Sequence, residues 1–363
     1  MKSPLVYIIV LNWNGLDLTV ACIESLKKCD YDNYRLLVID NCSSDGSDAA
    51  LKPAYPWLTI IENDRNIGFT GANNIGMRYA LEQGAEFVWL LNNDTEVAPD
   101  CLSLLVDELT HFENVGMISP ILYYFDDPNR VQFCGSYLDR STFFLVYPEN
   151  KVTAPESCFV TGDSVCLWGT ALLLKRSLIE HVGYLNDNYF AYWEDTEYSM
   201  RVLEAGFQGR VCTAAALYHK MPSPGNLPPR SRPHATYLML RNRYLLYSSC
   251  LTGVRFRKFL GDFFAEFIVE LGYAERLGDK TRVAACFLAL RDALRGKGGP
   301  VPILEGRCVG WLCVAVARTV AWHPYLLAHL VRGDLSLMIK KGLAAFFGAR
   351  QSRKRSAEIS EHK

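Results

Sequence analysis

The apolar positions of the chain fall into short continuous runs that alternate with longer segments of helical spacing. Short runs occur at 5–11, 34–39, 58–61, 87–91 and 117–123. Helical spacing occurs at 16–28, in a separate segment that ends at about residue 82, and at 99–112. Continuously apolar strands are typical of parallel sheets that are buried on both faces, and strands that alternate with helices build such sheets. The pattern predicts an α/β domain with a mostly parallel central sheet flanked by helices.

The pattern becomes less regular after residue 124. Prolines in 124–164 predict turns and short antiparallel strands. Further strands are expected at 169–175 and 209–218, and helices at 177–181 and from about 195 to 206.

A loop at 221–233, which contains five prolines, separates two regions of different composition. We expect a first domain at 1–233, a helical C-terminal extension at 234–350 and a charged, disordered tail at 351–363. The extension mixes basic residues with aromatic ones but has no apolar run of the length that spans a membrane. This composition favours peripheral membrane contact and, equally, ordinary packing against the first domain or a dimer partner.

Composition excludes several classes of protein. A formal net charge of −1 gives no basic field, so we expect no nucleic-acid partner. The twelve cysteines form no Cys-x-x-Cys pair, and Met1–Pro4 leads straight into a strand without a secretory signal, so a cytoplasmic location is expected. None of the predicted helices opens with a Gly-x-Gly-x-x-Gly or P-loop motif, which argues against dinucleotide dehydrogenases and P-loop enzymes.

Polar side chains follow several predicted strands. Amides or carboxylates come directly after three of them: Asn12 and Asn14, then Asp40 and Asn41, then Asn92, Asn93 and Asp94. The carboxyl ends of parallel strands meet at one edge of the sheet, where ligands bind in open α/β folds. Amide and carboxylate oxygens there suit a hard cation or a phosphate-bearing ligand. Each group taken alone is equally consistent with a polar turn or a helix cap.

Two later segments carry further candidates. A glycine-rich turn before the helix that ends at about residue 82 contains Arg65, which could bind a phosphate in bidentate fashion. An aromatic cluster that ends at Trp193 leads into an acidic helix start, where Asp195 is either a dipole-stabilising carboxylate or a general base. His219 ends a strand, a position more often structural than metal-binding.

Together these motifs resemble the family 2 glycosyltransferases of the GT-A fold, and within them the rhamnosyltransferase-like group. The resemblance covers about residues 4–245. It rests on Ile8–Gly15, Val38–Asn41 with Ser44–Ser47, Asn66–Phe69 with Gly71 and Asn73–Asn74, Leu90–Asp94, and Trp193–Asp195 with Glu197.

The resemblance implies roles for individual residues. It implies a divalent metal, Mg²⁺ or Mn²⁺, on Asp94 and His219, with Asn92 at the first position of the motif usually written Asp-x-Asp, and Asp195 as the catalytic base. It also implies a cleft for a nucleoside-diphosphate sugar lined by Asn12, Asn14, Asp40, Asn41, Arg65, Asn66, Gly68, Asn73, Asn92, Asn93, Trp193 and Glu194.

The expected activity is therefore inverting transfer of rhamnose or a related hexose to a hydroxyl of a glycan or polyprenyl-linked acceptor, at the inner face of the cell membrane. The Gln-x-x-Arg-Trp motif of processive synthases is absent, which favours one or a few sugars per encounter. The alternatives are a UDP-sugar donor, such as UDP-galactofuranose or UDP-N-acetylglucosamine, and a non-catalytic nucleotide- or carbohydrate-binding protein. A nucleotidyltransferase is disfavoured because Leu11–Leu16 holds neither a glycine cluster nor a cation.

Overall fold

The computed structural model describes residues 3–139, 144–147, 161–162, 164–223 and 232–304. The chain divides into two compact units. The first unit contains Met1–Arg230 together with Gly298–Pro300, and the second contains Ser231–Lys297 and Val301–Lys363. The apolar region after 304 and the charged tail at 351–363 lie outside the described residues, as does most of the proline-rich loop.

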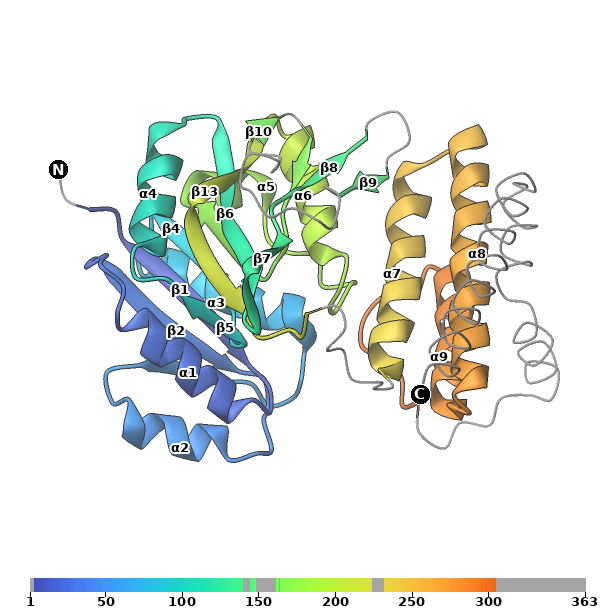
Figure 1. The fold of residues 1–363 in the computed structure, drawn as a ribbon, viewed down its shortest axis with the longest axis horizontal. Coiled ribbons are helices and arrows are strands. Elements are labelled where there is room, and N and C mark those ends of the chain that lie inside the picture. The colour runs from blue at the N-terminus through green and yellow to red at the C-terminus, as the bar shows by residue number, and fades with distance from the viewer. Residues whose placement is uncertain (1–2, 140–143, 148–160, 163, 224–231, 305–363) are drawn as a thin grey trace, which may run out of the picture. The chain divides into compact units, whose positions relative to one another are not determined.

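The first unit alternates strands and helices (Figure 1). Its first half contains β1 (Val6–Asn12), α1 (Leu16–Leu26), β2 (Tyr34–Asp40), α2 (Ser47–Ala54), β3 (Thr59–Glu62), α3 (Gly68–Glu82), β4 (Phe87–Asn92), β5 (Thr95–Val97) and α4 (Cys101–His111). Its second half contains β6 (Val115–Tyr124), β7 (Asp127–Phe133), β8 (Ser136–Leu138), β9 (Leu145–Val146), β10 (Thr161–Gly162), β11 (Val165–Cys166), β12 (Ala171–Lys175), α5 (Arg176–Val182), α6 (Glu194–Glu204) and β13 (Gln208–His219). The predicted α/β class is confirmed.

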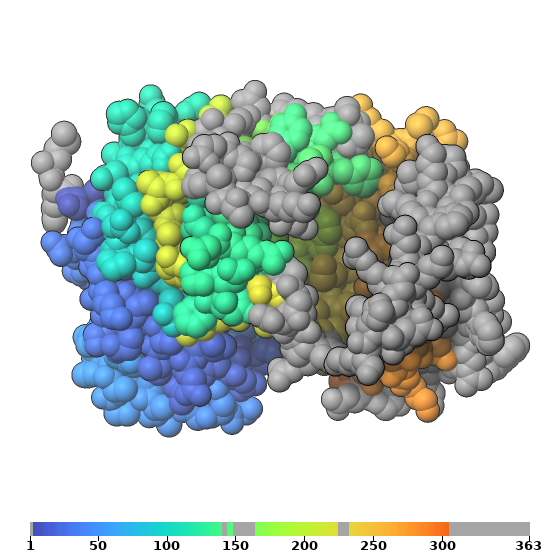
Figure 2. All heavy atoms as spheres, in the orientation of Figure 1, coloured from blue at the N-terminus to red at the C-terminus, as the bar shows by residue number. Residues whose placement is uncertain are grey.

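The central sheet is covered on both faces, as the continuous apolar strands predict. Within β1, Val6 and Ile8 pack into a core with α1 and α4, whereas Tyr7 and Ile9 pack into a second core with α3, α5 and α6. Successive side chains of a strand point to opposite faces, so only an uninterrupted apolar run can fill both cores. On the face shown in Figure 2, residues of β13 (yellow) reach the surface beside those of β7 (green).

The main sheet has the order β10-β13-β6-β12-β4-β1-β2-β3. Strands β4, β1, β2 and β3 are parallel, as are β6 and β13, but β12 runs antiparallel between β4 and β6. The sheet is therefore mixed around β12. As a result, the carboxyl ends of β1, β2 and β4 lie at the same edge as the start of β12, where the main chain of Asn92 donates to the carbonyl of Thr170 at 2.9 Å.

Short antiparallel strands occupy the less regular region, as expected. Strand β7 pairs with β6, and β11, β8 and β9 form a separate three-stranded sheet. Strand β5 pairs with the end of β13, in a register that places His219 opposite Thr95. Because Asp94 immediately precedes Thr95, this pairing brings the ends of β4 and β13 together.

The second unit contains α7 (Pro233–Cys250), α8 (Gly253–Arg276) and α9 (Lys280–Leu294). The aromatic residues of α8 are largely internal: Phe259 and Phe263 are fully buried and pack around Tyr244 of α7. These rings therefore pack within the second unit, against α7, which differs from the packing against the first domain or a dimer partner that the sequence pattern suggested. No helix among the described residues is both long and apolar enough to cross a bilayer.

A buried polar cluster joins α7 to α9 within the second unit. The hydroxyl of Tyr237 donates to Asp292 Oδ2 at 2.8 Å, and Arg291 Nε donates to Asp292 Oδ1 at 2.8 Å. Asp292 is almost completely buried, so this carboxylate depends on its donors. After α9, Gly298–Pro300 rejoins the first unit, where the amide of Gly299 donates to the carbonyl of Asn188 at 2.6 Å.

Candidate active site

The ends of β1 and β2 are tied together by buried polar side chains. Asn12 Nδ2 donates to Asp40 Oδ1 at 2.7 Å, and the amide of Ser43 donates to Asp40 Oδ2 at 2.9 Å. Ser43 Oγ also accepts from the main chain of Asn14, whose own Oδ1 accepts from the amide of Ser44 at 2.7 Å. The structure therefore brings Asn12, Asn14 and Asp40 together, as predicted. Each carboxylate oxygen has a second acceptor site, so Asp40 can also hold a ligand donor.

Asn41 joins this edge to the turn before α3. Its Nδ2 donates to Asn66 Oδ1 at 2.9 Å, and its Oδ1 accepts from the amide of Ile67 at 3.1 Å. Asn66 Oδ1 accepts in addition from the amide of Gly68 at 2.9 Å. Asn41 and Asn66 thus shape the turn, and beside them the side chain of Arg65 is exposed. This arrangement leaves the guanidinium accessible to a phosphate.

The side chains of Asn73 and Asn93 form hydrogen bonds with other groups of the protein. Asn73 is buried on α3, where Nδ2 donates to the carbonyl of Phe69 at 2.9 Å and Oδ1 has no partner among the described residues. Asn93 Nδ2 donates to Thr19 Oγ1 at 2.9 Å and lies 3.4 Å from Asn12 Oδ1. The two asparagines therefore support the walls of the predicted cleft.

Asp94 and His219 meet at the junction of β4, β5 and β13. Asp94 Oδ1 lies 3.2 Å from His219 Nε2, and His219 Nδ1 lies 2.8 Å from Gln132 Oε1 on β7. Burial raises the pKa of Asp94, but His219 and Lys220 outweigh it, so the net pKa of this carboxyl is lowered. At neutral pH, Asp94 is therefore an ionised carboxylate.

The Asp94–His219 pair fits a divalent cation. Asp94 Oδ1 is buried and has no hydrogen-bond donor of good geometry among the described residues. Leaving an ionised oxygen in this state is unfavourable in free energy. The described residues contain no group of three or more acidic, histidine or cysteine side chains arranged for a metal. A cation here would take two ligands from the protein and complete its shell with phosphate oxygens and water, as Mg²⁺ commonly does.

Asp195 lies at the start of α6, next to the start of β12. Its Oδ2 accepts from the amide of Gly169 at 3.1 Å, and its Oδ1 accepts from the amide of Thr196 at 2.6 Å. Burial raises the pKa of Asp195 above its ordinary value, against the lowering effect of these amides. Gly169 adjoins Thr170, the main-chain partner of Asn92, so Asp195 borders the edge that carries Asp94.

Glu194, beside Asp195, is more deeply buried. Its side chain is 6% exposed, and its Oε2 has no hydrogen-bond partner among the described residues. Burial, with a further contribution from the charge of Asp195, raises the pKa of Glu194 well above its ordinary range. Both neighbouring carboxyls therefore have raised pKa values, and Asp195 is the one that accepts hydrogen bonds from backbone amides.

Strained backbone is concentrated at this site. Among the described residues, five that are not glycine have positive φ, and all five border the site: Asn14 (52°), Cys42 (63°), Phe190 (66°), Tyr192 (68°) and Trp193 (70°). Left-handed conformations cost non-glycine residues about 1 kcal/mol or more each, and they cluster where function requires a fixed geometry. No pattern of residues had indicated this strain.

Gly68 makes a close contact that a larger residue would disturb. It has a φ of 83°, and a Cβ there would lie 2.5 Å from the carbonyl oxygen of Phe190. We expect Gly68→Ala to destabilise the protein by about 2 kcal/mol or more, through left-handed strain plus backbone displacement. Gly84→Ala is the matched control, because Gly84 has the same φ of 83° and open space around it. Equal losses of melting temperature in the two variants would contradict a role for the Phe190 contact.

Several residues at the site were not singled out from the sequence. Gln132, Ser43 and Thr19 each bind a predicted residue, and Gly169 donates to Asp195. Gln132 is 87 positions from His219, so no local spacing connects the two residues. Of these residues, only Ser43 could have been found from the sequence, because it belongs to the polar turn after Asp40.

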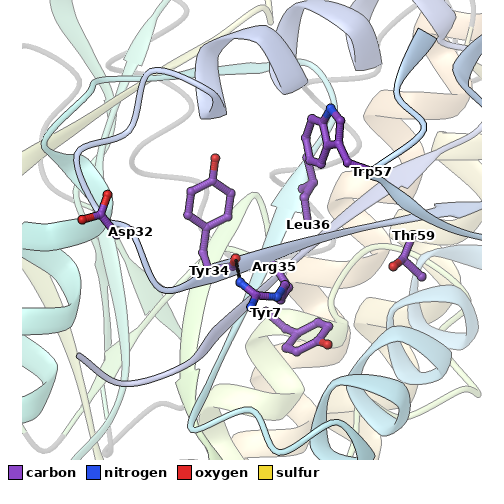
Figure 3. Close-up of a pocket in the computed structure, with 7 residues that line it drawn as sticks. All are labelled: Tyr7, Asp32, Tyr34, Arg35, Leu36, Trp57 and Thr59. Carbon is purple, nitrogen blue, oxygen red and sulfur yellow. Dashed lines mark hydrogen bonds between the residues drawn. The ribbon is translucent and has the colours of Figure 1, made fainter. Parts of the chain in front are cut away.

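A cavity of about 330 Å³ lies at the opposite ends of the strands. Tyr34 and Thr59, the first residues of β2 and β3, line it together with Trp57 and Arg35 (Figure 3). Because these residues lie at the amino ends of parallel strands, the cavity is separate from the polar edge that holds Asp40 and Asp94.

Comparison with known sequences finds similar proteins for the first unit. Residues 7–183 match the model of the family described as glycosyl transferase family 2. The low-salt glycan biosynthesis hexosyltransferase Agl10 of Haloferax volcanii is 28% identical over 216 residues, which cover 59% of this chain and 67% of that protein. The N-acetylglucosaminyl-diphospho-decaprenol L-rhamnosyltransferase of Mycobacterium tuberculosis is 24% identical over 235 residues, which cover 58% of this chain and 75% of that protein. For another relative, the match spans only 24% of its length.

Comparison with solved structures confirms the expected GT-A fold. The mannosyltransferase PcManGT of Pyrobaculum calidifontis, solved with GDP-Man and Mn²⁺, aligns with a TM-score of 0.50 over 94% of this chain and 88% of that one, at 17% identity. At this identity the likeness shows the fold alone.

Proposed function

We propose that the chain is an inverting glycosyltransferase of cell-surface glycan synthesis, and the match of residues 7–183 to the model of glycosyl transferase family 2 supports this proposal. The proposed donor is a nucleoside-diphosphate sugar that carries rhamnose or a related hexose. The proposed acceptor is a hydroxyl of a glycan or a polyprenyl-linked saccharide. The names of the relatives from M. tuberculosis and H. volcanii support this substrate class.

The observation that carries the proposal is the placement of Asp195. Two backbone amides hold its carboxylate beside the sheet edge that bears Asp94, and a raised pKa strengthens it as a base. The neighbouring carboxyl of Glu194 is buried, and burial raises its pKa well above the ordinary range, which disfavours a role as a nucleophile. One base without a protein nucleophile favours direct displacement, which inverts the anomeric carbon.

In the proposed reaction, the acceptor hydroxyl forms a bond to the anomeric carbon as the bond from this carbon to the diphosphate breaks. Asp195 takes the proton of the hydroxyl, and the nucleoside diphosphate leaves with the electron pair. Asp40 and Arg65 would hold the nucleotide, and Asn41 would shape the turn beside them. A divalent ion on Asp94 and His219 would neutralise the charge of the leaving diphosphate.

The test is a panel of nucleotide-sugars. Saturation-transfer NMR identifies which base and sugar the protein binds without knowledge of the acceptor, and a transfer assay with the binding donors follows. The dTDP-rhamnose donor is to be compared with UDP-galactofuranose and UDP-N-acetylglucosamine. Binding of a donor without any hydrolysis or transfer would instead establish the non-catalytic alternative.

We further propose that the second unit contacts the cytoplasmic leaflet through the start of α8. Val254 is 72% exposed there, and the exposed residues Arg255, Arg257 and Lys258 follow it. An apolar residue beside several cations suits an anionic interface. This surface replaces the internal rings of α8 as the expected point of contact.

We expect the protein to sediment with anionic vesicles and to be released by high salt or alkaline carbonate, because the contact is interfacial. Arg257→Glu should weaken sedimentation, whereas Lys28→Glu, the same charge change at an exposed position after α1, should not. Retention through both washes would indicate an integral protein, and no sedimentation at low salt would contradict membrane contact.

A further inference from the structure

The segment between α5 and α6 leads to Asp195, and one buried side chain of α3 holds its beginning. Asn74 Nδ2 donates to the carbonyl of Leu185 at 2.8 Å and to Asp187 Oδ1 at 2.8 Å. Asn74 Oδ1 in turn accepts from the amide of Leu185 at 3.0 Å. The amide of Asn74, whose residue is 1% exposed, therefore pairs with both backbone groups of Leu185 as a neighbouring strand would.

Helix α3 also contacts the end of this segment. The amide of Thr70 donates to the carbonyl of Phe190 at 3.2 Å, and Gly68 lies against the same carbonyl. Thr70 and Asn74 are four positions apart, so they lie on one face of the helix. This face therefore holds the segment at both Leu185 and Phe190.

Between these anchors the segment is tightly turned. The amide of Tyr189 donates to the carbonyl of Asn186, and the amide of Phe190 donates to that of Asp187. The left-handed residues Phe190, Tyr192 and Trp193 follow, and Asp195 comes two residues later. A chain confined in this way transmits a shift at Leu185 to the start of α6, because few of its dihedrals are free to absorb it.

The same helix is anchored at the donor edge. Its first residues are held through Asn41 and Asn66, the residues that shape the proposed nucleotide site. Helix α3 thus lies between the groups that would hold the donor and the segment that carries the base. The relative position of the base and the donor therefore depends on the contacts of α3.

We propose that Asn74 is a positioning residue that sets the placement of the Asp195 carboxylate by fixing residues 185–193 on α3. This inference rests on the proposed function. Asn74 is buried and its amide binds Leu185 and Asp187, so its loss would lower the turnover number and leave nucleotide binding unchanged. A displacement of about 1 Å at a catalytic group costs on the order of a hundredfold in rate.

The test compares Asn74→Ala with Lys175→Met. Lys175 is a matched control because its Nζ binds the backbone carbonyls of Phe112 and Glu113 from β12, outside the site. For Asn74→Ala we expect kcat about ten- to a hundredfold lower, unchanged affinity for the nucleoside diphosphate, and faster amide hydrogen exchange confined to residues 185–193. Lys175→Met should keep the wild-type kcat.

A charge swap provides a second test. Asn74→Asp puts a carboxylate against the carbonyl of Leu185 and the carboxylate of Asp187, so its kcat should fall further than that of Asn74→Ala. Adding Asp187→Asn restores a donor and acceptor pair between positions 74 and 187, and kcat should partly recover.

Wild-type kcat and exchange in Asn74→Ala would overturn the inference, as would an equal loss of kcat in Lys175→Met. If the wild type binds nucleotide-sugars but transfers none, the proposed function fails, whereas the exchange comparison still decides whether Asn74 holds the segment.

Discussion

Asp195→Asn is expected to lower glycosyl transfer by about a hundredfold or more, because an amide cannot accept the proton of the acceptor hydroxyl. Nucleotide binding should survive, since Asp195 lies outside the turns that carry Asp40 and Asn41. The measurements are kcat with the identified donor and the dissociation constant of its nucleoside diphosphate.

Stability separates this role from that of a helix-start carboxylate. An acidic residue kept only for the helix dipole contributes about 0.3–1 kcal/mol, and asparagine caps about as well. The variant loses an acceptor for the amide of Gly169 or Thr196, but it is also relieved of a buried charge. We therefore expect a melting temperature within a few degrees of the wild type, together with the large loss of rate.

The pH profile gives an independent readout. The base must be deprotonated to act, and burial raises the pKa of Asp195, so wild-type kcat should fall as the pH drops toward that raised pKa. Glu180→Gln is the control and should keep the wild-type pH profile, because Glu180 is paired with Arg176 at 2.7 Å on α5. Near-normal transfer by Asp195→Asn would remove Asp195 as the base and direct attention to Glu194 or Glu197.

Asp94→Ala is expected to abolish metal-assisted binding of the donor, because Asp94 supplies the only acidic side chain of the Asn92–Asp94 edge. His219→Ala should weaken the metal by roughly tenfold or more, as loss of a ligand does. Isothermal titration with Mn²⁺ and the nucleoside diphosphate measures both effects without turnover.

The control for this pair is Glu96→Gln. Glu96 lies two residues after Asp94 on β5 and pairs with Lys220 at 2.8 Å, so it reports any general change in local charge. It should leave the metal dependence unchanged. Metal dependence that persisted unaltered in Asp94→Ala and His219→Ala would eliminate this metal site.

The sequence predicted features that depend on local pattern. The run at 5–11 became β1 because apolar residues at every position are needed to fill cores on both faces. Asp40 and Asp94 were found because a parallel strand places whatever follows it at the ligand edge. Their proposed roles came from the family motifs.

The sequence did not predict what tertiary pairing decides. Strand β12 carries the same kind of apolar run as its neighbours, so its reversed direction was not apparent. Asn74 meets Leu185 across 111 positions, and no periodicity connects the two residues. In α8, one pattern of basic and aromatic residues fits both a membrane surface and a packed interior, and only the burial of Phe259 and Phe263 separates these possibilities.

The return of Gly298–Pro300 to the first unit has a consequence for how the chain can be divided. The polypeptide leaves the first unit at Arg230 and comes back before Val301, so the helices α7, α8 and α9 form an insertion with two covalent tethers rather than an appended tail. A Cβ at Gly298 would lie 2.6 Å from the carbonyl oxygen of Asn188, so this peptide fits closely against the segment before Asp195. Cutting the gene after Arg230 would therefore remove part of the first unit's own packing, so a fragment that keeps this packing must extend at least to Pro300.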